Sequence, residues 1–399
     1  MSANKTRRLS LAEKIFSVRN EGTRKVICIL GLKIRFRTPR LVYRELNARL
    51  DQAQDLIAGL QTRLDQSQNA VDEFKARIEQ QTEAFQAEFH SGLERQAQDF
   101  NSRINGIYAK LMYRIHEYCP DEKRAVALKD WYFEKTGETL NLDNPRTFNE
   151  KIQWLKLYDS TPIKTLLADK YAVRGWIKEK IGAKYLVPLL GVWDSFDDIN
   201  FNTLPERFVL KCNHGSGYNI IVKDKSKLDL GGVRRQIKSW MNENFAFRNG
   251  FELHYSSIQR KIIAEQYIEN QDSDLYDYKF WCFDGKVKYI LFLSERNTYG
   301  VKLAFYDRNW QKQNFSDDGP INPKEIQKPD NLDLMIELAE KLAKGFCHVR
   351  VDFYDVNNKI YFGEMTFYTL SGLCTWTPKE MNFDFGRMIK LPKLSDCTE

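Results

Sequence analysis

FVLKCNHGSGYNIIVKDK, residues 208–225, places a turn with one histidine and two glycines between two short apolar runs, each of which ends in a lysine. Two strand-like runs joined by a short glycine turn predict a β-hairpin. Gly215 and Gly217 let the backbone approach a ligand closely and point N–H groups at one place, which suits a phosphate. Lys211 and Lys223 could neutralise that phosphate, although, taken alone, an ordinary hairpin with exposed lysines explains the stretch better.

A second stretch, RKIIAEQYIE (260–269), is an apolar strand that ends at Glu265. A strand end that carries a carboxylate and unpaired backbone groups could contact an adenine and its ribose, but this signal is weak alone. Downstream, LYDYKFWCFDGKV (275–287) holds Asp277 and Lys279 on a further predicted strand, followed by an Asp-Gly turn.

The third stretch is HVRVDFYDVNNKIYFGEMTFYTLSG, residues 348–372. Arg350 and Asp352 alternate on one face of a predicted strand, and the Asn-Asn turn at 357–358 sends the chain back antiparallel. Asp352 and Glu364 then lie nearly opposite. Two carboxylates on one face suit Mg²⁺, which binds one or two carboxylates together with substrate phosphates. A surface Arg–Asp pair beside an unrelated glutamate is an equally good explanation of this stretch alone.

Charge is distributed unevenly along the 399 residues. Residues 1–40 carry eleven Lys/Arg and two Glu, a net of +9, whereas the whole chain is +7 and the remainder therefore −2. The basic arm indicates binding to an anionic surface, and its apolar clusters favour peripheral binding to a membrane. A short strand or hairpin is the alternative. The slightly acidic body and the lack of a recognisable fold in the arm argue against a nucleic-acid partner.

Residues 41–115 are rich in Gln, Glu, Arg, Ala and Leu, and contain no proline. Apolar residues recur in steps of three and four, which is the heptad pattern of a coiled coil. A single helix this polar cannot bury its row of apolar residues by itself. We therefore predict a homo-oligomeric coiled coil, with a solvated single helix as the alternative.

Residues 120–395 alternate helical patterns with eight β-branched or aromatic runs and predict one globular α/β unit. The seven cysteines form no CxxC pair, which fits a reducing cytosol.

Taken in order, the three stretches resemble the ATP-grasp superfamily. More narrowly, TFNEKIQWLKLYD (147–159), FVLKCNHGSG (208–217), DYKFWCFDGKV (277–287) and VRVDFY…IYFGEMTFY (349–368) resemble the TupA-like ATP-grasp family, over about residues 120–392. The resemblance implies an α/β (α+β) ATP-grasp fold, here preceded by the long coiled-coil helix, with ATP and Mg²⁺ as cofactors. It does not extend to residues 41–115.

The resemblance also implies roles for matching residues. Lysines 170 and 211 would touch phosphates, Arg350 and Lys211 would stabilise the transferring phosphoryl group, and Arg296 is a further catalytic candidate. The remaining nucleotide-binding candidates are His214, Gly215, Ser216, Gly217 and Asn219 in the glycine turn, Glu265, Gln266 and Ile268 at the adenine, and Asp277 at the ribose. The metal ligands would be Asp352, Glu364 and Thr366; many ATP-grasp enzymes have asparagine at the third position, and often a Pro-Gly turn where this chain has YTLSG.

The implied activity is an ATP- and Mg²⁺-dependent carboxylate–amine ligase that acts through an acyl phosphate. Its substrates would be a bacterial cell-surface polysaccharide, such as a capsule, or its glycan precursor, and an amino acid or amine. The protein would be cytoplasmic, held at the inner face of the cytoplasmic membrane by its arm. The alternatives are a glycosyltransferase or phosphotransferase of the same biosynthesis, and a non-catalytic coiled-coil scaffold with a degenerate ATP-grasp body.

Overall fold

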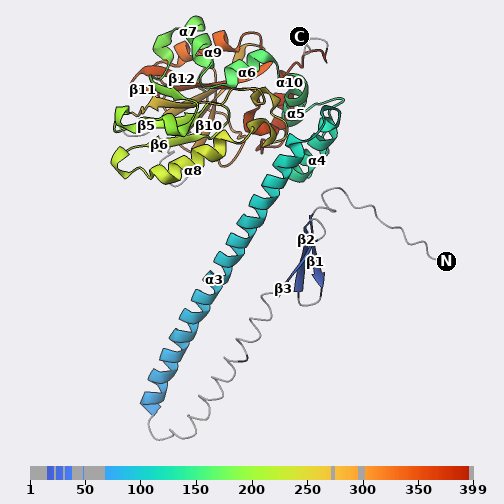
Figure 1. Ribbon diagram of the computed structural model, residues 1–399, viewed down its shortest axis with the longest axis vertical. Helices are drawn as coiled ribbons and strands as arrows, with labels where there is room; N and C mark the ends of the chain where they lie inside the picture. Colours follow the sequence, from blue (N-terminus) through green and yellow to red (C-terminus); the bar gives the residue numbers. More distant parts are fainter. Residues whose placement is uncertain are drawn as a thin grey trace, which may run out of the picture. The chain divides into compact units, whose positions relative to one another are not determined.

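The computed structural model describes residues 16–21, 24–29, 32–37, 48, 68–270, 275–294 and 302–394. The chain divides into two units, Met1–Ser102 and Arg103–Glu399. Figure 1 shows the elements of both. In the described residues, no helix is long and apolar enough to cross a membrane.

The first unit contains a three-stranded antiparallel sheet and most of a long helix. Strands β1 (Phe16–Glu21), β2 (Arg24–Ile29) and β3 (Leu32–Arg37) pair in the order β1-β2-β3. This agrees with the strand alternative for the arm, and its membrane binding stays a prediction. Helix α3 (Gln68–Glu117) runs without a break through the second half of the predicted coiled coil and ends two residues beyond it. The rest of the predicted helix lies almost wholly outside the described residues, and the coiled-coil partner stays a prediction.

The second unit holds two antiparallel sheets and the remaining helices. The small sheet has the order β4-β7-β5-β6 and the large sheet β10-β9-β8-β11-β12. The strands are β4 (Leu189–Trp193), β5 (Phe208–Cys212), β6 (Asn219–Val222), β7 (Ile262–Gln266), β8 (Tyr276–Phe283), β9 (Lys286–Ser294), β10 (Lys302–Asp307), β11 (His348–Val356) and β12 (Lys359–Thr366). The helices are α4 (Arg124–Thr136), α5 (Phe148–Tyr158), α6 (Pro162–Ala168), α7 (Val173–Lys180), α8 (Leu230–Met241), α9 (Leu332–Ala343) and α10 (Met381–Met388). Short 3-10 turns join them: η1 (Asp121–Lys123), η2 (Ala183–Tyr185), η3 (Phe196–Asp198), η4 (Phe201–Thr203), η5 (Lys225–Lys227), η6 (Phe245–Phe247), η7 (Leu253–Tyr255) and η8 (Thr369–Gly372).

The predicted strands and turns are confirmed. Each of the eight runs forms a strand, and the glycine hairpin is β5–β6, with Lys211 opposite Asn219. Asn357 and Asn358 both take positive φ angles, 52° and 62°, as the two-residue turn of the β11–β12 hairpin requires. α6 and α7 are separate helices because the chain leaves the helical path at Asp169.

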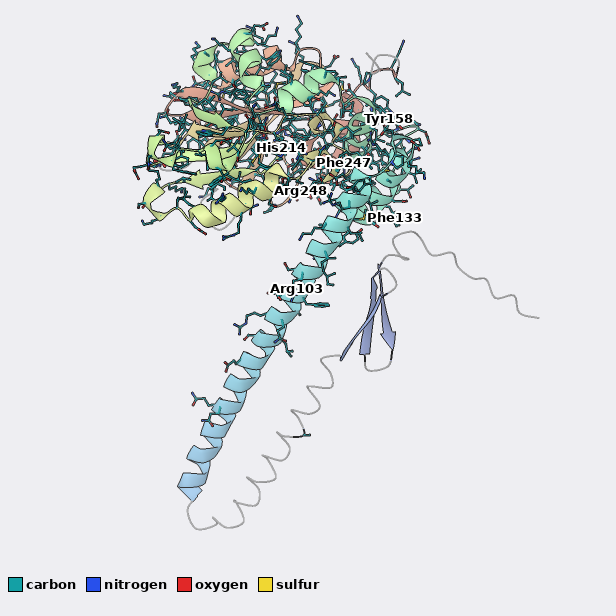
Figure 2. All side chains as sticks on the ribbon, in the orientation of Figure 1. Arg103, Phe133, Tyr158, His214, Phe247 and Arg248 are labelled. Atoms are coloured by element: carbon teal, nitrogen blue, oxygen red, sulfur yellow. The ribbon has the colours of Figure 1, made fainter. Side chains whose placement is uncertain are left out.

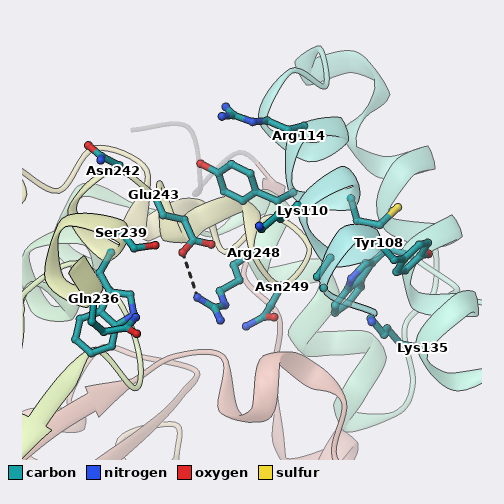
Figure 3. Close-up of a pocket in the computed structure, with 16 residues that line it drawn as sticks. Tyr108, Lys110, Arg114, Lys135, Gln236, Ser239, Asn242, Glu243, Arg248 and Asn249 are labelled. Carbon is teal, nitrogen blue, oxygen red and sulfur yellow. Dashed lines mark hydrogen bonds and ion pairs between the residues drawn. The ribbon is translucent and has the colours of Figure 1, made fainter. Parts of the chain in front are cut away.

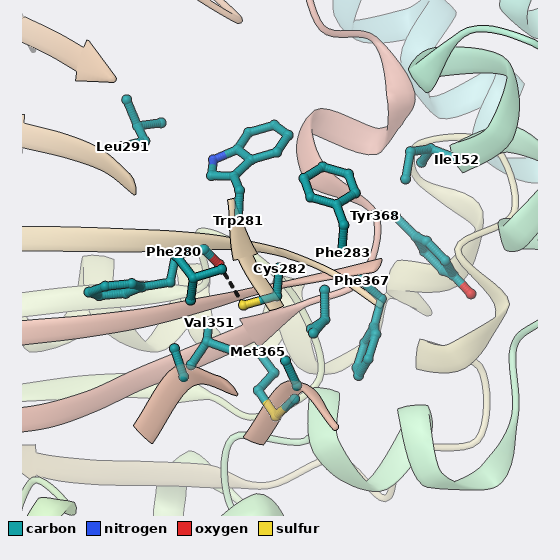
Figure 4. Close-up of a cluster of buried hydrophobic side chains, with 14 of the residues drawn as sticks. Ile152, Phe280, Trp281, Cys282, Phe283, Leu291, Val351, Met365, Phe367 and Tyr368 are labelled. Carbon is teal, nitrogen blue, oxygen red and sulfur yellow. Dashed lines mark hydrogen bonds between the residues drawn. The ribbon is translucent and has the colours of Figure 1, made fainter. Parts of the chain in front are cut away.

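The large sheet is buried on both faces, and this fixes where polar residues can stand. On one face of β8, Trp281 and Phe283 pack against Phe385 of α10, with ring centroids 5.4 and 5.7 Å apart. Figure 4 shows Trp281 and Phe283 projecting to the same side of the strand. On the other face α9 packs against β8, β9 and β11. Because direct partners in antiparallel strands share a face, Lys279 and its partner Asp352 lie on the same face as Trp281, further along the strands. The aromatic end of this face is therefore core, and its other end carries the charged residues.

Candidate active site

Lys170 connects the two sheets. The Asp169 carboxylate accepts hydrogen bonds from the backbone N–H groups of Tyr171 and Ala172, at 2.8 and 3.1 Å, and so fixes the turn that precedes α7. The interruption between α6 and α7 turns Lys170 toward the glycine turn, where its Nζ donates to the Gly215 carbonyl at 2.7 Å. The same Nζ lies 3.8 Å from Oε2 of Glu364 on the large sheet. Burial lowers the pKa of Lys170, which makes its ammonium group a poorly solvated charge in need of anions.

Glu265 is held between two cations on the small sheet. Its carboxylate pairs with Lys211 Nζ at 2.6 Å and with the Arg174 guanidinium of α7 at 2.8 Å, and the residue is only 7% exposed. Arg174 also donates to the Val187 carbonyl at 2.7 Å. Burying a carboxylate is tolerable here because both of its oxygens are paired. Lys211 and Arg174 together carry one more positive charge than the Glu265 carboxylate can balance.

A second charged group covers the polar end of the large sheet. Arg350 donates to both oxygens of Asp352 at 2.8 Å, and Lys279 pairs with Asp352 at 2.6 Å and with Asp277 at 2.9 Å. Arg350 also reaches Glu364 at 3.3 Å. The bidentate geometry is the strong form of the arginine–carboxylate pair.

Glu364 stands where these groups meet. It is the direct partner of Asp352 in the β11–β12 register, as predicted, and a β-bulge follows at once. Burial alone would raise the pKa of the Glu364 carboxyl, but Lys170, Arg350 and Lys279 outweigh it and hold that pKa at about 2. Its side chain keeps 36% of its surface exposed. Glu364 is thus a fully ionised, accessible carboxylate among cations.

The sequence of residues 150–390, well over half of the chain, matches the family model "TupA-like ATPgrasp". The chain belongs to the TupA-like ATP-grasp family. Its two antiparallel sheets and their covering helices form the ATP-grasp fold.

Several solved ATP-grasp structures are similar to this chain. The D-alanine–D-alanine ligase of Bacillus anthracis complexed with ATP is 18% identical over 50% of this chain and 55% of that chain, with a TM-score of 0.33. An L-amino acid ligase from Bacillus licheniformis is 14% identical over 62% of this chain and 53% of that one, with a TM-score of 0.35. A RimK domain protein from Sphaerobacter thermophilus is 12% identical over 57% and 69%, with a TM-score of 0.30. The chain thus spans about half the length of the first of these ligases. No curated protein matches significantly.

Magnesium has a small but suitable donor set in this family member. Among the described residues there is no group of three or more His, Cys, Asp or Glu that could hold a metal ion. The Thr366 hydroxyl lies 3.2 Å from Oε1 of Glu364, and Asp352 is opposite. These oxygens fit Mg²⁺, which uses one or two carboxylates and completes its shell with phosphates and water. Because both oxygens of Asp352 already accept from Arg350 or Lys279, Glu364 is the more available ligand.

His214 differs from the sequence-based expectation. It was expected in a loop over the phosphates, but the residue is 2% exposed and its Nε2 donates to the Trp240 carbonyl at 3.0 Å. Figure 2 labels His214 within the 103–399 unit. Its ring packs edge-on against Tyr218, with centroids 5.6 Å apart. The ring therefore anchors the turn to α8, and its burial argues against a direct contact with a phosphate. Of the other turn candidates, Ser216, Gly217 and Asn219 are exposed and Gly215 is buried.

The candidates for the adenine and the ribose lie at or just beyond the end of β7 and on β8. Gln266 is exposed and its backbone N–H donates to the Pro188 carbonyl at 2.9 Å, while Ile268 is half-buried beside Val187 and Tyr361. Asp277, expected at a ribose, is 1% exposed and paired with Lys279, because both side chains project from one face of β8. This burial argues against the ribose contact. Arg296 lies outside the described residues.

Sequence reasoning missed three positioning residues. Asn213 is fully buried, and its side chain bonds Asp169, Gln259 and the backbone N–H of Lys261. Arg174 and Lys279 are ion-paired partners of predicted site residues. The one available signal was position, since Asn213 directly follows the strand that carries Lys211, and Lys279 lies two residues from Asp277.

Proposed function

We propose that this chain is an ATP- and Mg²⁺-dependent carboxylate–amine ligase that modifies a bacterial surface polysaccharide or its precursor through an acyl phosphate. Membership of the TupA-like ATP-grasp family supports the ATP-dependent ligase chemistry. The observation that carries it in this structure is the meeting of two cations and an ionised carboxylate: Arg350 and Glu364 of the large sheet, and Lys170, which also donates to the glycine turn of the small sheet. This is the charge pattern that a metal-bound polyphosphate requires.

The residues would act mainly by position and charge. Lys170, Lys211 and Arg350 would hold the phosphates, and the Gly215–Gly217 turn would close over them. Mg²⁺, held by Glu364 with Asp352 and Thr366, would neutralise phosphate charge when bound. The acceptor carboxylate oxygen attacks the γ-phosphorus and the bond to ADP breaks. The amine then attacks the acyl carbon, phosphate leaves, and the amine proton ends on that phosphate.

Hydroxylamine provides the direct test, because it replaces the amine and converts an acyl phosphate into a hydroxamate. The hydroxamate then forms a coloured complex with added ferric iron. The full chain would be incubated with ATP, Mg²⁺, hydroxylamine and uronic-acid oligosaccharides. We expect hydroxamate and ADP in equal amounts, and neither from Glu364→Gln. Release of a nucleoside diphosphate from a sugar nucleotide would instead establish a transferase. Failure of calorimetry to detect any nucleotide binding would identify a scaffold.

The N-terminal segments have separate proposed roles. We propose that residues 1–40 bind an anionic membrane surface and that residues 41–115 join copies of the chain through a coiled coil. The support is the net charge of +9 in the arm and the heptad pattern that follows. Deleting residues 1–40 should abolish sedimentation with vesicles that contain an anionic lipid, and deleting residues 41–115 should reduce the mass in solution to that of one chain. Unchanged sedimentation or mass would refute the corresponding role.

A further inference from the structure

A cavity lies in the 103–399 unit, apart from the charged residues described above. It has a volume of about 650 Å³ and is lined by the last turns of α3, by α4, by α8 and by the segment 242–249 (Figure 3). None of its lining residues belongs to the Lys170–Glu364 group or to the Lys211–Glu265 pair. Its volume is in the range of small-molecule sites. The cavity is therefore large enough for a ligand of its own.

The cavity carries positive charge. Lys110 of α3, Lys135 of α4 and Arg248 line it, and its single acidic side chain is Glu243. Glu243 is already neutralised, because it accepts from Arg248 at 3.1 Å and from the Tyr218 hydroxyl at 2.6 Å. Neither lysine forms an ion pair with any residue that the structure describes. Figure 3 shows Lys110 and Arg248 facing the same space. An anionic group would find cations there without displacing an existing carboxylate.

Aromatic rings and amides also line the cavity. Trp240 and Tyr113 contribute partly exposed rings, whose electron-rich faces suit the C–H bonds of a sugar ring. Gln236, Asn242 and Asn249 supply amides, which both donate and accept and so suit hydroxyl groups. Cations, ring faces and amides together match a sugar that bears a negative charge.

The segment 240–249 also contacts the glycine turn and the 369–372 turn, which begins three residues after Thr366 at the end of β12. Trp240 stacks on Tyr218, at 5.0 Å between centroids and 14° between planes, and its carbonyl accepts from His214 of the glycine turn. The Asn249 carbonyl accepts from Lys156 Nζ at 2.7 Å and from the Ser371 hydroxyl at 2.8 Å. A ligand that fixes Trp240 and Asn249 would therefore restrict the glycine turn and the 369–372 turn together.

We propose that this cavity binds an acidic saccharide, a sugar ring carrying a carboxylate or a phosphate, and that the bound sugar stabilises the glycine turn for ATP. The sugar site follows from the lining alone, whereas its effect on ATP binding rests on the proposed function. A uronic acid and a sugar phosphate both supply the negative charge, and the cavity has the same recognition chemistry for both.

The test is calorimetry on the full chain with three probes: digalacturonate, glucose 6-phosphate and neutral cellobiose. We expect one or both acidic sugars to bind and cellobiose to bind at least tenfold more weakly. Lys110→Gln/Lys135→Gln should weaken acidic-sugar binding at least tenfold. Lys129→Gln, which removes a lysine of the same helix α4 outside the cavity, should not change it.

A second comparison separates this site from the ATP site. Asp352→Asn/Glu364→Gln should keep acidic-sugar binding while losing Mg²⁺-dependent ATP binding, and in the wild type the sugar should tighten ATP binding at least threefold. Binding that survives Lys110→Gln/Lys135→Gln, or that disappears only with Asp352→Asn/Glu364→Gln, would place the sugar in the ATP site and overturn the proposal. So would the absence of binding by either acidic probe. Sugar binding without any effect on ATP would refute the link to the glycine turn.

Discussion

The side-chain amide of Asn213 donates a hydrogen bond to the Asp169 carboxylate over 2.8 Å, joining the glycine turn of the small sheet to the start of α7. The backbone repeats the link, since the Lys170 N–H donates to the Asn213 carbonyl at 3.1 Å. Asn213 also accepts from the Lys261 N–H at 2.7 Å and donates to the Gln259 carbonyl at 2.9 Å. One buried carboxamide thus sets the relative position of three segments around Lys170.

Asn213→Ala should therefore lower both stability and ATP affinity. The substitution leaves the Lys261 N–H and the Gln259 carbonyl without their partner, and buried unsatisfied groups of this kind cost about 1–3 kcal/mol each. We expect the free energy of unfolding to fall by about 2–4 kcal/mol and the KM for ATP to rise, as measured by urea unfolding and initial rates. Asn105→Ala, on the exposed surface of α3, is the matched control. An unchanged KM would mean that Asn213 does not position Lys170.

Glu265 should be energetically coupled to Arg174. Removing Arg174 leaves the Glu265 carboxylate with Lys211 as its one remaining ion-pair partner, and removing the Glu265 charge leaves both cations without their carboxylate. Breaking a buried pair typically costs about 3–5 kcal/mol, and Lys211 reduces that cost for Arg174. In a double-mutant cycle of Arg174→Met and Glu265→Gln, we expect a coupling free energy of about 1–3 kcal/mol in urea unfolding. The control cycle uses Lys238→Met and Asp197→Asn, an ion pair at 3.1 Å whose side chains are both about half exposed. That exposed pair should show no measurable coupling, and equal coupling in the two cycles would contradict the role of burial.

The two glycines of the turn should respond differently to alanine. A Cβ at Gly215 would lie 2.7 Å from the Phe245 ring and 2.9 Å from the Tyr218 ring, so both buried rings would have to move. At Gly217 nothing lies within 4 Å, and the obstacle is only its φ of +74°. Gly217→Ala should cost about 1–2 kcal/mol for the left-handed conformation, and Gly215→Ala should cost about 1–3 kcal/mol through overpacking.

Calorimetry separates the two effects on function. Because Tyr218 and Phe245 hold the turn against α8, Gly215→Ala should also weaken ATP binding several-fold. Gly217→Ala, whose added methyl group enters open space, should weaken it less. The reverse order would show that the exposed tip of the turn, and not its packing, determines ATP affinity.

The sequence predicted the parts of this fold that depend on local rules. Runs of β-branched and aromatic residues located the strands, and the Asn357–Asn358 turn made it possible to count back to Asp352 opposite Glu364. Contacts between distant segments were not predictable in this way. Arg174 and Glu265 are 91 residues apart, and no local pattern indicates that α7 lies against β7. The burial of His214 likewise depends on the packing of α8 over the hairpin, which the polar residues around His214 in the sequence do not indicate.

Four histidines make the protein sensitive to acid. His116, His214, His254 and His348 are each at most 2% exposed. Burial lowers the pKa of each imidazole, to about 4 for His116 and about 3 for His348. Below pH 6.5 the unfolded chain binds protons at these sites and the folded chain does not, so stability falls as the pH decreases. Burial raises the pKa of Asp317 to about 6, and this carboxyl acts in the opposite direction between about pH 4 and 6.

His348 isolates one contribution. Its Nδ1 donates to the Cys282 carbonyl at 3.0 Å, and its ring packs on Phe283 with centroids 4.7 Å apart. As the pH decreases, each such group lowers the free energy of unfolding by up to about 1.4 kcal/mol per pH unit, or by about 2 kcal/mol between pH 7 and pH 5. His348→Phe keeps the ring but cannot be protonated. We expect it to be somewhat less stable than the wild type at pH 8, from the lost hydrogen bond, and to lose about 2 kcal/mol less between pH 7 and pH 5 in urea unfolding. Parallel pH profiles of the two proteins would show that His348 is protonated in the folded state.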